Sequence, residues 1–528
     1  MSLAALLTDE SLDFARRHLT KFYDSDFFPK PFEFDAIWYK WDEFKALPRD
    51  SYVPSATSIA IPWKKARGGY RVVHQLNPID AIVLTAMTYT ISQKVETRRR
   101  ANSNAACSYQ IHTDSSGFFR SGSGFERYRA KCEHLASIHE FVLMTDISDF
   151  YNQIYLHRLE NAISDATNTG AGKIFENFLM ALNNKNSQGI PVGPAASIIL
   201  SEAVLIDLDE FIADRGFSHA RYVDDIRIFA NSLHELDVLL QDLTLYLHQS
   251  HRLGLVGDKT KILKTTDFVQ LELNNQYQLE KLEILDDIES SDFYSNPNNE
   301  EIKDENDLED DHEQIGIKLL EALKRINTHD HLDLGLARAI LRRARNGKHE
   351  EIVDFMFENL MKFRPVMNDV VLYLEAITNE NTIYGIQQQM RQLITGKLHH
   401  DISIAEWFSW YVGNHELLSK DLHFQEILNR TQRKSNVARS IVKAQKVNWV
   451  RQHKDRLLTY GPWDRKAVIY SAQILTKDEK ENWLKPLKKN QSLDMLDKWM
   501  IDWVVSGLPK VPSLPEPEID LFEDDIPF

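Results

Sequence analysis

The sequence contains very little cysteine and no long hydrophobic segment. Only Cys107 and Cys132 occur among its 528 residues, too few for a disulfide framework or a cysteine zinc finger. No uninterrupted apolar run approaches the roughly 20 residues that a membrane helix needs. The apolar residues 1–7 are followed by Asp9 and Glu10, so we expect neither a signal peptide nor a transit peptide. The sequence therefore predicts a cytoplasmic protein.

Positive charge is also scarce over the whole chain, whose net charge is −16. Such a deficit argues against a nucleic-acid partner, but it is unevenly distributed. Residues 281–320 contain 14 acidic residues and three lysines, whereas residues 431–490 contain 15 lysines and arginines and five acidic residues. The acidic block has few apolar residues, which is typical of a disordered linker or excursion. The basic block keeps nucleic-acid binding open.

Two adjacent carboxylates, Asp224 and Asp225, lie between two β-prone runs in residues 221–229. The run after them alternates apolar and polar residues, which is the period of a strand, so both acids are predicted at the tip of a β-hairpin. Hard oxygen ligands of this kind suit Mg²⁺ or Mn²⁺. A plain surface turn is the alternative for this motif by itself.

A third carboxylate ends a predicted buried strand. Residues 141–145 form the apolar run expected of a central strand, and Asp146 follows directly. A carboxylate at the end of a buried strand is costly unless it is paired or bound to a metal. Asp146 is therefore the second candidate for a metal ligand.

Two loops have the composition needed to approach a phosphorylated ligand. A Gly-Gly turn at 68–69 separates two short β-prone runs, and this hairpin could place Lys64, Lys65 and Arg71 on a polyanion. A solvated basic hairpin is the alternative. Residues 187–194 contain two glycines and two prolines, a rigid turn whose backbone a base pair or nucleotide can approach.

The predicted order of elements is strand, helix, hairpin, helix and strand. The helices run from 195 to about 211 and from 233 to about 248, and the last strand lies within 259–264. This is the split β-α-β arrangement of an α+β palm. Beyond residue 315, amphipathic helical stretches recur to about Trp503 with no strict repeat period, which we interpret as a solenoid of irregular helical pairs.

Five motifs in this order resemble the reverse transcriptase family. They are the basic hairpin, Asp146 with an aromatic residue five positions later, Gln-Gly-x-Pro at 188–191, Tyr-x-Asp-Asp at 222–225, and Gly-x-x-x-x-Lys-Thr at 254–260. The resemblance covers about residues 55–270. It implies a right-hand polymerase with fingers and palm that joins nucleotides by catalysis with two Mg²⁺ or Mn²⁺ ions.

The resemblance also implies roles for single residues. Asp146 and Asp224 match the principal metal ligands, and Asp225 matches the supporting carboxylate. Lys259 matches the lysine that protonates the pyrophosphate leaving group. Tyr151 matches the gate under the sugar, where a ring leaves no room for a 2′-hydroxyl and favours DNA synthesis. The implied dNTP-binding residues are Lys64, Lys65, Arg71, Tyr151, Gln188 and Gly189.

We expect four segments: fingers and palm over 1–275, an acidic linker or excursion over 276–314, an all-α, HEAT-like domain over 315–510, and a disordered acidic tail over 511–528. The sequence of the second half reveals no zinc-ligand cluster, no endonuclease motif and no carboxylate set of the ribonuclease H type. A reverse transcriptase joined to a long helical half resembles the bacterial abortive-infection, or defence-associated, group. That resemblance implies antiphage activity, homo-oligomers, and DNA synthesis that can do without a template and can start from a protein hydroxyl.

Two alternatives remain open at this stage. One is a templated reverse transcriptase of the retron or intron kind. The other is a non-catalytic scaffold whose palm only binds nucleic acid or a partner. The presence of all three carboxylates favours catalysis, because clustered acids without a use only lower stability.

Two features outside the palm predict binding partners. The basic block interleaves cations with Trp449 and Tyr460, a pattern suited to single-stranded DNA, although a solvated helix face is the alternative. The chain ends in acids followed by Ile-Pro-Phe, and this tip resembles the C-terminal peptide of the bacterial single-stranded DNA-binding protein. It implies docking onto host proteins that bind that tail. The predicted nucleic-acid contacts are Arg433, Lys434, Arg439, Lys443, Lys446 and Arg451, and the predicted tail contacts are Asp524, Asp525, Ile526, Pro527 and Phe528.

Overall fold

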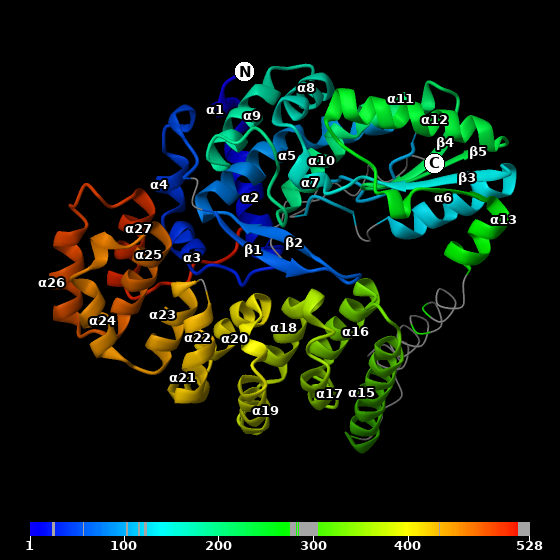
Figure 1. Ribbon diagram of the computed structural model, residues 1–528. Coiled ribbons are helices and arrows are strands. Elements are labelled where there is room, and N and C mark those ends of the chain that lie inside the picture. Colours follow the sequence, from blue (N-terminus) through cyan, green and yellow to red (C-terminus); the bar gives the residue numbers. More distant parts are fainter. Residues whose placement is uncertain are drawn as a thin grey trace.

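A mixed α+β region is followed by a largely helical part in the computed structural model (Figure 1). The structure describes residues 1–23, 27–55, 58–101, 104–113, 117–120, 124–274, 281, 284, 305–431 and 433–515. Within these ranges, no helix is both long enough and apolar enough to cross a membrane.

The α+β region is built on a four-stranded antiparallel sheet in the order β4-β5-β3-β6. Leu143 of the central strand packs into the main core on one face, whereas its neighbours Val142 and Met144 pack beneath α6 on the other. Burial on both faces explains why this strand reads as a continuous apolar run. The strands are β3 (Phe141–Asp146), β4 (Ser218–Tyr222), β5 (Asp225–Ala230) and β6 (Lys261–Lys264), and α6 is Phe125–Ile138.

Helices form the core on the other side of the sheet. The main ones are α5 (Pro78–Ala101), α8 (Leu156–Thr167), α9 (Ala171–Leu182), α10 (Ala195–Val204), α11 (Ile206–Ala213) and α12 (Leu233–Tyr246), with a short α7 (Phe150–Gln153) after β3. The single helix predicted from 195 to about 211 is therefore wrong, because the helix is interrupted at Leu205. This break allows α11 to pack against β4.

The predicted basic hairpin is present as β1 (Ile59–Lys64) and β2 (Tyr70–Gln75). Its apolar face packs on the helical part of the chain. Ile61, Trp63 and Val73 belong to the hydrophobic core of that part, and the Trp63 indole N–H donates to the Pro365 carbonyl at 3.1 Å. The hairpin and the C-terminal half therefore share a core.

The helical part is an arc whose alternate helices lie in a row (Figure 1). In this row α16 contacts α18, α18 contacts α20, α20 contacts α23, α23 contacts α25, and α25 contacts α27. The helices are α15 (Glu305–Thr328), α16 (Leu334–Gly347), α17 (Val353–Glu358), α18 (Met367–Ile377), α19 (Ile383–Thr395), α20 (Ile402–Asn414), α21 (Glu416–Lys420), α22 (Gln425–Arg430), α23 (Lys434–Lys443), α24 (Val447–Lys454), α25 (Pro462–Ser471), α26 (Lys477–Leu487) and α27 (Met495–Val505).

The end of the arc returns to the start of the chain. Helix α27 packs on α3 (Glu33–Tyr39), the Trp499 indole N–H donates to a Glu43 carboxylate oxygen at 3.2 Å, and the hydroxyls of Tyr39 and Ser506 are 3.1 Å apart. The first helices, α1 (Leu3–Leu6), α2 (Asp9–Lys21), α3 and α4 (Trp41–Lys45), share the main core with the palm and with α23–α27. The N-terminal helices thus connect the palm to the far end of the arc.

Two predicted segments are only partly covered by the described residues. Of the acidic linker expected over 276–314, the part from Glu305 onward belongs to helix α15, and the remainder, apart from Lys281 and Ile284, lies outside the described residues. The tail expected over 511–528 is described only as far as Pro515. The predicted tail contacts therefore lie outside the described residues.

Candidate active site

The three predicted carboxylates meet at one edge of the palm sheet. Asp146 ends β3 and is the register partner of Asp225 at the start of β5, and the Ile147 N–H donates to the Asp224 carbonyl at 3.2 Å. Burial, reinforced by the nearby Asp146 carboxylate, raises the pKa of Asp224 to about 6. Burial also raises the pKa of Asp225. Negative charge is thus concentrated where the hairpin meets the central strand.

Two cationic side chains contact these carboxylates directly. Lys259 Nζ lies 2.5 Å from Asp146 Oδ2, and the Arg227 guanidinium bonds both oxygens of Asp225, with Nη2 and Oδ2 3.1 Å apart. Asp224 forms no ion pair with any described residue. A bound cation would therefore relieve the repulsion between Asp146 and Asp224.

The turn that holds Asp224 is constrained by the backbone of Val223. Val223 has a left-handed φ of 56°, which is strained for a β-branched residue. Its carbonyl accepts a hydrogen bond from Arg221 Nη1 at 2.9 Å, and its N–H donates to Ser108 Oγ at 3.2 Å. These two contacts hold the turn in place.

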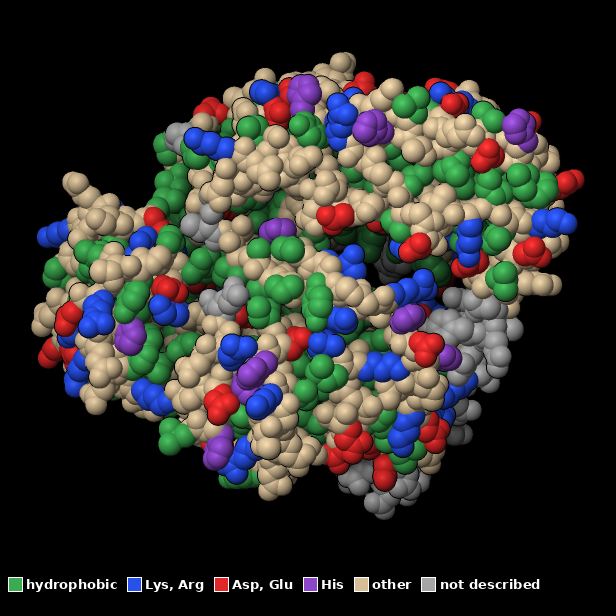
Figure 2. Space-filling model, in the orientation of Figure 1, with side chains coloured by type: hydrophobic (Ala, Val, Ile, Leu, Met, Phe, Trp, Pro, Cys, Tyr) green, Lys and Arg blue, Asp and Glu red, His purple; other side chains and the backbone are tan. Residues whose placement is uncertain are grey.

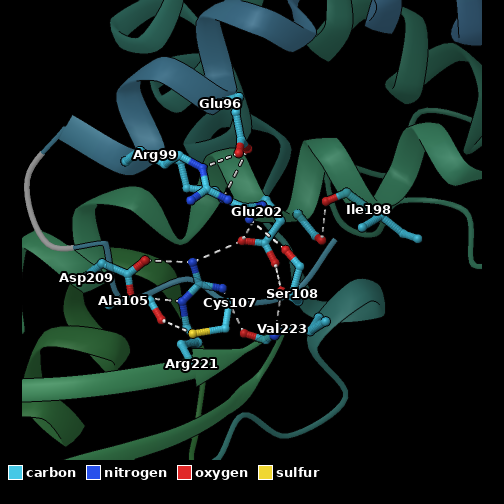
Figure 3. A network of polar contacts seen from close by, with 12 residues as sticks. Glu96, Arg99, Ala105, Cys107, Ser108, Ile198, Glu202, Asp209, Arg221 and Val223 are labelled. Carbon is cyan, nitrogen blue, oxygen red and sulfur yellow. Dashed lines mark hydrogen bonds and ion pairs between the residues drawn. The ribbon is translucent and has the colours of Figure 1, made fainter. Parts of the chain in front are cut away.

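Arg221 and Ser108 belong to a buried polar network under the turn (Figure 3). The Arg221 guanidinium makes a two-point contact with Asp209, with distances of 2.8 and 2.6 Å, and lies 3.0 Å from Glu202. Ser108 Oγ donates to Glu202 at 2.8 Å, and Arg99 donates to the Ser108 carbonyl at 2.6 Å. Burial by itself would raise the pKa of Asp209, but Arg221 offsets this and holds it well below its usual value.

Sequence reasoning missed this network. Arg221 was visible as the first residue of the acidic hairpin motif, but nothing local indicated that it is fully buried. Glu202 is the one acid of the apolar helix α10, which was an available signal, whereas Asp209 is one of three acids in α11 and had no such signal.

Arg71 and Tyr151 lie close to the carboxylates. Burial and the neighbouring Arg338 of α16 lower the pKa of Arg71, while Asp224 and Tyr151 act in the opposite direction. The Tyr151 hydroxyl accepts a hydrogen bond from Ser201 Oγ at 3.3 Å, and burial raises its pKa. Arg338 is a neighbour that sequence reasoning did not find, because it comes from the helical half.

The predicted Gln188-Gly189 loop lies against the Tyr151 segment. The Gly189 N–H donates to the Ile154 carbonyl at 2.9 Å, and the Ile190 N–H donates to the Tyr151 carbonyl at 3.0 Å. Gly189 has a φ of 88°, and a Cβ there would lie 3.2 Å from the Asn152 carbonyl oxygen. Only glycine suits this position, so the loop needs its glycine to approach the segment that contains Tyr151.

The structure does not bring Lys64 to the side of Arg71. In the hairpin register Lys64 pairs with Tyr70 and Arg71 pairs with Trp63, and consecutive strand residues point to opposite faces. Lys64 Nζ lies over the Tyr70 ring, 4.8 Å from its centroid, and Lys65 is exposed in the turn. The register therefore places Lys64 and Arg71 on opposite faces of the hairpin, and it is Arg71 on which the charge of Asp224 acts.

Part of the predicted nucleic-acid surface is used inside the protein. Arg433 is only 3% exposed, and its Nη1 donates to the Pro29 carbonyl at 2.8 Å, so its assignment as a nucleic-acid contact is wrong. Arg439 lies over the Phe32 ring. Lys434 pairs with Asp464 and Arg451 pairs with Glu479, both at 2.8 Å. Within the described residues, Lys443 and Lys446 form no ion pair.

Comparisons with solved structures give only distant similarity. Apo telomerase from Candida tropicalis is 10% identical, with 63% of this chain and 65% of that chain covered and a TM-score of 0.31. Telomerase from Candida albicans in complex with a TWJ fragment of telomeric RNA is 11% identical, with coverages of 69% and 68% and a TM-score of 0.31. The RNA-dependent RNA polymerase of bacteriophage phi12 is 10% identical, with coverages of 65% and 70% and a TM-score of 0.26. The chain thus spans less than two thirds of the length of the first of these proteins.

Family comparison is more specific than these structural similarities. No curated protein matches the sequence. Residues 63–281, which contain β2 and the whole palm sheet, match the family model described as reverse transcriptase (RNA-dependent DNA polymerase). Residues 63–281 of this chain are therefore a reverse transcriptase domain, that is, an RNA-dependent DNA polymerase domain.

Proposed function

We propose that the protein joins dNTPs into DNA at the edge of the palm where Asp146 and Asp224 meet. The observation that carries this proposal is the convergence of three carboxylates at one end of β3 and β5 in a reverse transcriptase domain. Asp146 and Asp224 are the two acids that no guanidinium chelates, whereas Asp225 is bonded to Arg227. This difference supports Asp146 and Asp224 as the principal ligands and Asp225 as their support.

Two Mg²⁺ or Mn²⁺ ions fit this donor set, because its oxygens are hard ligands and the Asp146 carboxylate lies near Asp224, which has no ion pair with a described residue. Bound there, the ions would activate a 3′-hydroxyl and carry the triphosphate. We assign the protonation of the leaving pyrophosphate to Lys259, and the contact of its ammonium group with Asp146 supports this role. We assign the offsetting of phosphate charge to Arg71.

The helical half contributes to the same site in this proposal. Helix α16 contains four arginines and no acidic residue, and its Arg338 lies close enough to Arg71 to lower the pKa of that guanidinium. Arg338 and Arg342 lie 3.2 and 3.3 Å from Asp369. Two guanidiniums close enough for their charges to interact, as those of Arg71 and Arg338 are, suit an anion that binds near both. Figure 2 shows a hollow between the palm and the arc with Lys and Arg side chains at its rim, and this supports a path for phosphates there.

The finer proposal follows from the resemblance to the abortive-infection group. We propose that the arc is HEAT-like, that the protein forms homo-oligomers, and that it acts in antiphage defence by making DNA without a template, with a protein hydroxyl as the primer. The row of alternating helix contacts supports the HEAT-like interpretation. The joining of a reverse transcriptase domain to a long helical part supports the rest.

The test is incubation with labelled dNTPs and Mg²⁺ or Mn²⁺, with and without an added RNA template and primer. A gel run before and after protease treatment then shows whether the product is attached to protein. Incorporation without template, into a product whose mobility changes on proteolysis, is the expected result. Incorporation only with template would instead identify a retron-like or intron-like enzyme. No incorporation under any of these conditions would identify a non-catalytic scaffold.

Tyr151→Ala is expected to relax the choice of sugar. Removing the ring removes the clash with a 2′-hydroxyl, so ribonucleotide incorporation should rise at least about tenfold relative to dNTPs, which corresponds to about 1.4 kcal/mol of discrimination. Tyr151→Phe is the matched control, because it keeps the ring and loses only the hydroxyl bonded to Ser201. Competition between dNTPs and ribonucleotides measures the effect. Equal use of both by the unmutated protein would refute the gate.

The C-terminal tip is expected to bind a host protein that recognises the tail of the single-stranded DNA-binding protein. Its upstream acids would steer it, and the Phe528 ring would dock in an apolar pocket. Deleting Phe528 should therefore abolish binding in a pull-down with such a protein and leave nucleotide incorporation unchanged. Phe522→Ala, an aromatic loss within the same tail, is the control. Undiminished binding after the deletion would leave only a solubilising acidic tail.

A further inference from the structure

Two histidines and a glutamate come together far from the palm carboxylates in sequence. His312 lies on α15, while His349 and Glu351 lie in the connection between α16 and α17. Each offers a nitrogen or carboxylate oxygen, and these atoms all lie within 4.8 Å of one another. The two imidazole rings stack with centroids 4.2 Å apart, and His349 Nδ1 lies 3.9 Å from Glu351 Oε2.

Donor atoms of this cluster are buried without a partner. His349 is 3% exposed, and neither its Nδ1 nor Glu351 Oε2 has a hydrogen-bond partner among the described residues. Such atoms are costly to bury unless something binds them. His312 uses Nε2 to donate to the Gly347 carbonyl at 2.7 Å, so its Nδ1 keeps a free lone pair. A backbone carbonyl on the far nitrogen is the usual support of a metal-binding histidine.

Two glycines leave room for the side chains of the cluster. A Cβ at Gly347 would lie 2.3 Å from His349 Nε2, and a Cβ at Gly316 would lie 2.3 Å from the Glu351 carboxylate. Any larger residue at either position would displace a donor group. The helices on both sides are therefore shaped around the His349 ring and the Glu351 carboxylate.

We propose that His312, His349 and Glu351 bind a Zn²⁺ ion, with a water molecule in the fourth position. Two imidazoles and one carboxylate are a ligand set that zinc accepts, whereas Mg²⁺ prefers oxygen ligands only. The buried Nδ1 of His349 and the buried Oε2 of Glu351, both without a hydrogen-bond partner among the described residues, are the donor atoms that the ion would satisfy. The ion would connect α15 to the segment between α16 and α17. This zinc site shares no ligand with the palm carboxylates.

A second cluster in the same molecule shows the difference between a metal site and an ordinary ion-pair group. His157, Glu160 and Glu176 also lie together, but the Lys173 ammonium bonds Glu176 and lies 3.8 Å from Glu160. A cation of the protein already occupies that position. In the His312 cluster, Arg343 is close enough for its charge to act on His349, but no lysine or arginine of the described residues forms an ion pair with Glu351.

This cluster was not predictable from ligand spacing, and the zinc proposal departs from the expectation that the second half contains no zinc-ligand cluster. His349 and Glu351 are separated by one residue, but His312 comes from the preceding helix. Only the packing of α15 on α16 brings the third ligand into place.

The experiment uses the full-length protein after treatment with a chelator and dialysis into excess Mg²⁺, which keeps the palm carboxylates filled. Zn²⁺ is titrated by calorimetry, and Co²⁺ is used as an optical probe, because its visible absorption reports a tetrahedral site with nitrogen ligands. We expect one Zn²⁺ per chain, a higher thermal midpoint on binding, and an intense Co²⁺ spectrum.

The exposed His312 allows a variant that leaves the core intact. His312→Ala and Glu351→Gln should each weaken Zn²⁺ binding at least tenfold and abolish the rise in thermal midpoint, with an unchanged far-ultraviolet circular dichroism spectrum. His157→Ala, in the cluster occupied by Lys173, should bind Zn²⁺ like the unmutated protein. Absence of Zn²⁺ binding by the unmutated protein, or equal affinity in His312→Ala and Glu351→Gln, would overturn the proposal.

Discussion

Asp224→Asn is expected to abolish nucleotide incorporation while the protein stays folded. The substitution removes the charge of a proposed metal ligand and almost no volume. Loss of a single group that stabilises transition-state charge lowers rates by about 10²–10³-fold, and loss of a ligand to the metals should be at least as severe. Incorporation of labelled dNTPs, measured beside circular dichroism, is the test.

Asp258→Asn is the matched control for this variant. Asp258 is an exposed carboxylate in the same turn as Lys259, and its removal should leave incorporation within about twofold, because it is not one of the three carboxylates that meet at the sheet edge and exposed substitutions usually have small effects. Asp146→Asn should behave like Asp224→Asn. Near-normal incorporation by either of these two ligand variants would refute the assignment of the site.

Asp224→Asn should also be more stable than the unmutated protein when no metal is present. The pKa of Asp224 rises from 3.8 to about 6 on folding, so the folded state binds its proton more tightly than the unfolded state does. The contribution of Asp224 to stability is therefore favourable at low pH and falls as the pH rises toward 6. Above that pH, Asp224→Asn should raise the thermal midpoint by roughly a few degrees in the presence of a chelator, and added Mg²⁺ should remove the difference.

Local sequence patterns were sufficient to predict the elements that contain the carboxylates. The apolar run before Asp146 and the alternation after Asp225 identify β3 and β5, because both signals depend on neighbouring residues only. The reverse transcriptase domain was also predictable and is confirmed. The break at Leu205 was not, since the apolar residues on both sides continue the same helical pattern.

The contacts that determine which residues reach the site depend on distant packing. Nothing near Arg71 in sequence indicates Arg338, because the helical half must fold against the hairpin before the two guanidiniums meet. The role of Arg433 was misjudged for the same reason, since its guanidinium is buried against the Pro29 carbonyl. Charge composition identified a basic block but could not say which of its cations face solvent.

The buried network under the Tyr-x-Asp-Asp turn makes Arg221 the most sensitive structural position near the site. Its guanidinium contacts Asp209 and Glu202, all three side chains are at most 3% exposed, and Arg221 itself is fully buried. Removing one partner from such a group leaves uncompensated buried charge, which typically lowers stability by about 3–5 kcal/mol. Arg221→Met, which keeps most of the volume, should therefore lower the free energy of unfolding by that amount.

Arg215→Met is the control for the loss of an arginine as such. Arg215 is paired with Asp242 at 3.7 Å on the surface, where an ion pair contributes about 0–1 kcal/mol. Urea unfolding of the two variants should thus separate a buried network from an exposed pair. A loss for Arg221→Met as small as that for Arg215→Met would show that the network does not stabilise the palm.

A double variant separates buried charge from lost packing. Adding Asp209→Leu to Arg221→Met removes one of the stranded carboxylates, so the double variant should be more stable than Arg221→Met alone. It should nevertheless remain impaired in nucleotide incorporation at temperatures where it is fully folded. The reason is the turn, because the Val223 carbonyl accepts its hydrogen bond from Arg221, and without that bond the strained left-handed Val223 can relax and move Asp224 away from Asp146. Full recovery of both stability and incorporation in the double variant would show that Arg221 acts only by neutralising Asp209 and does not position the turn.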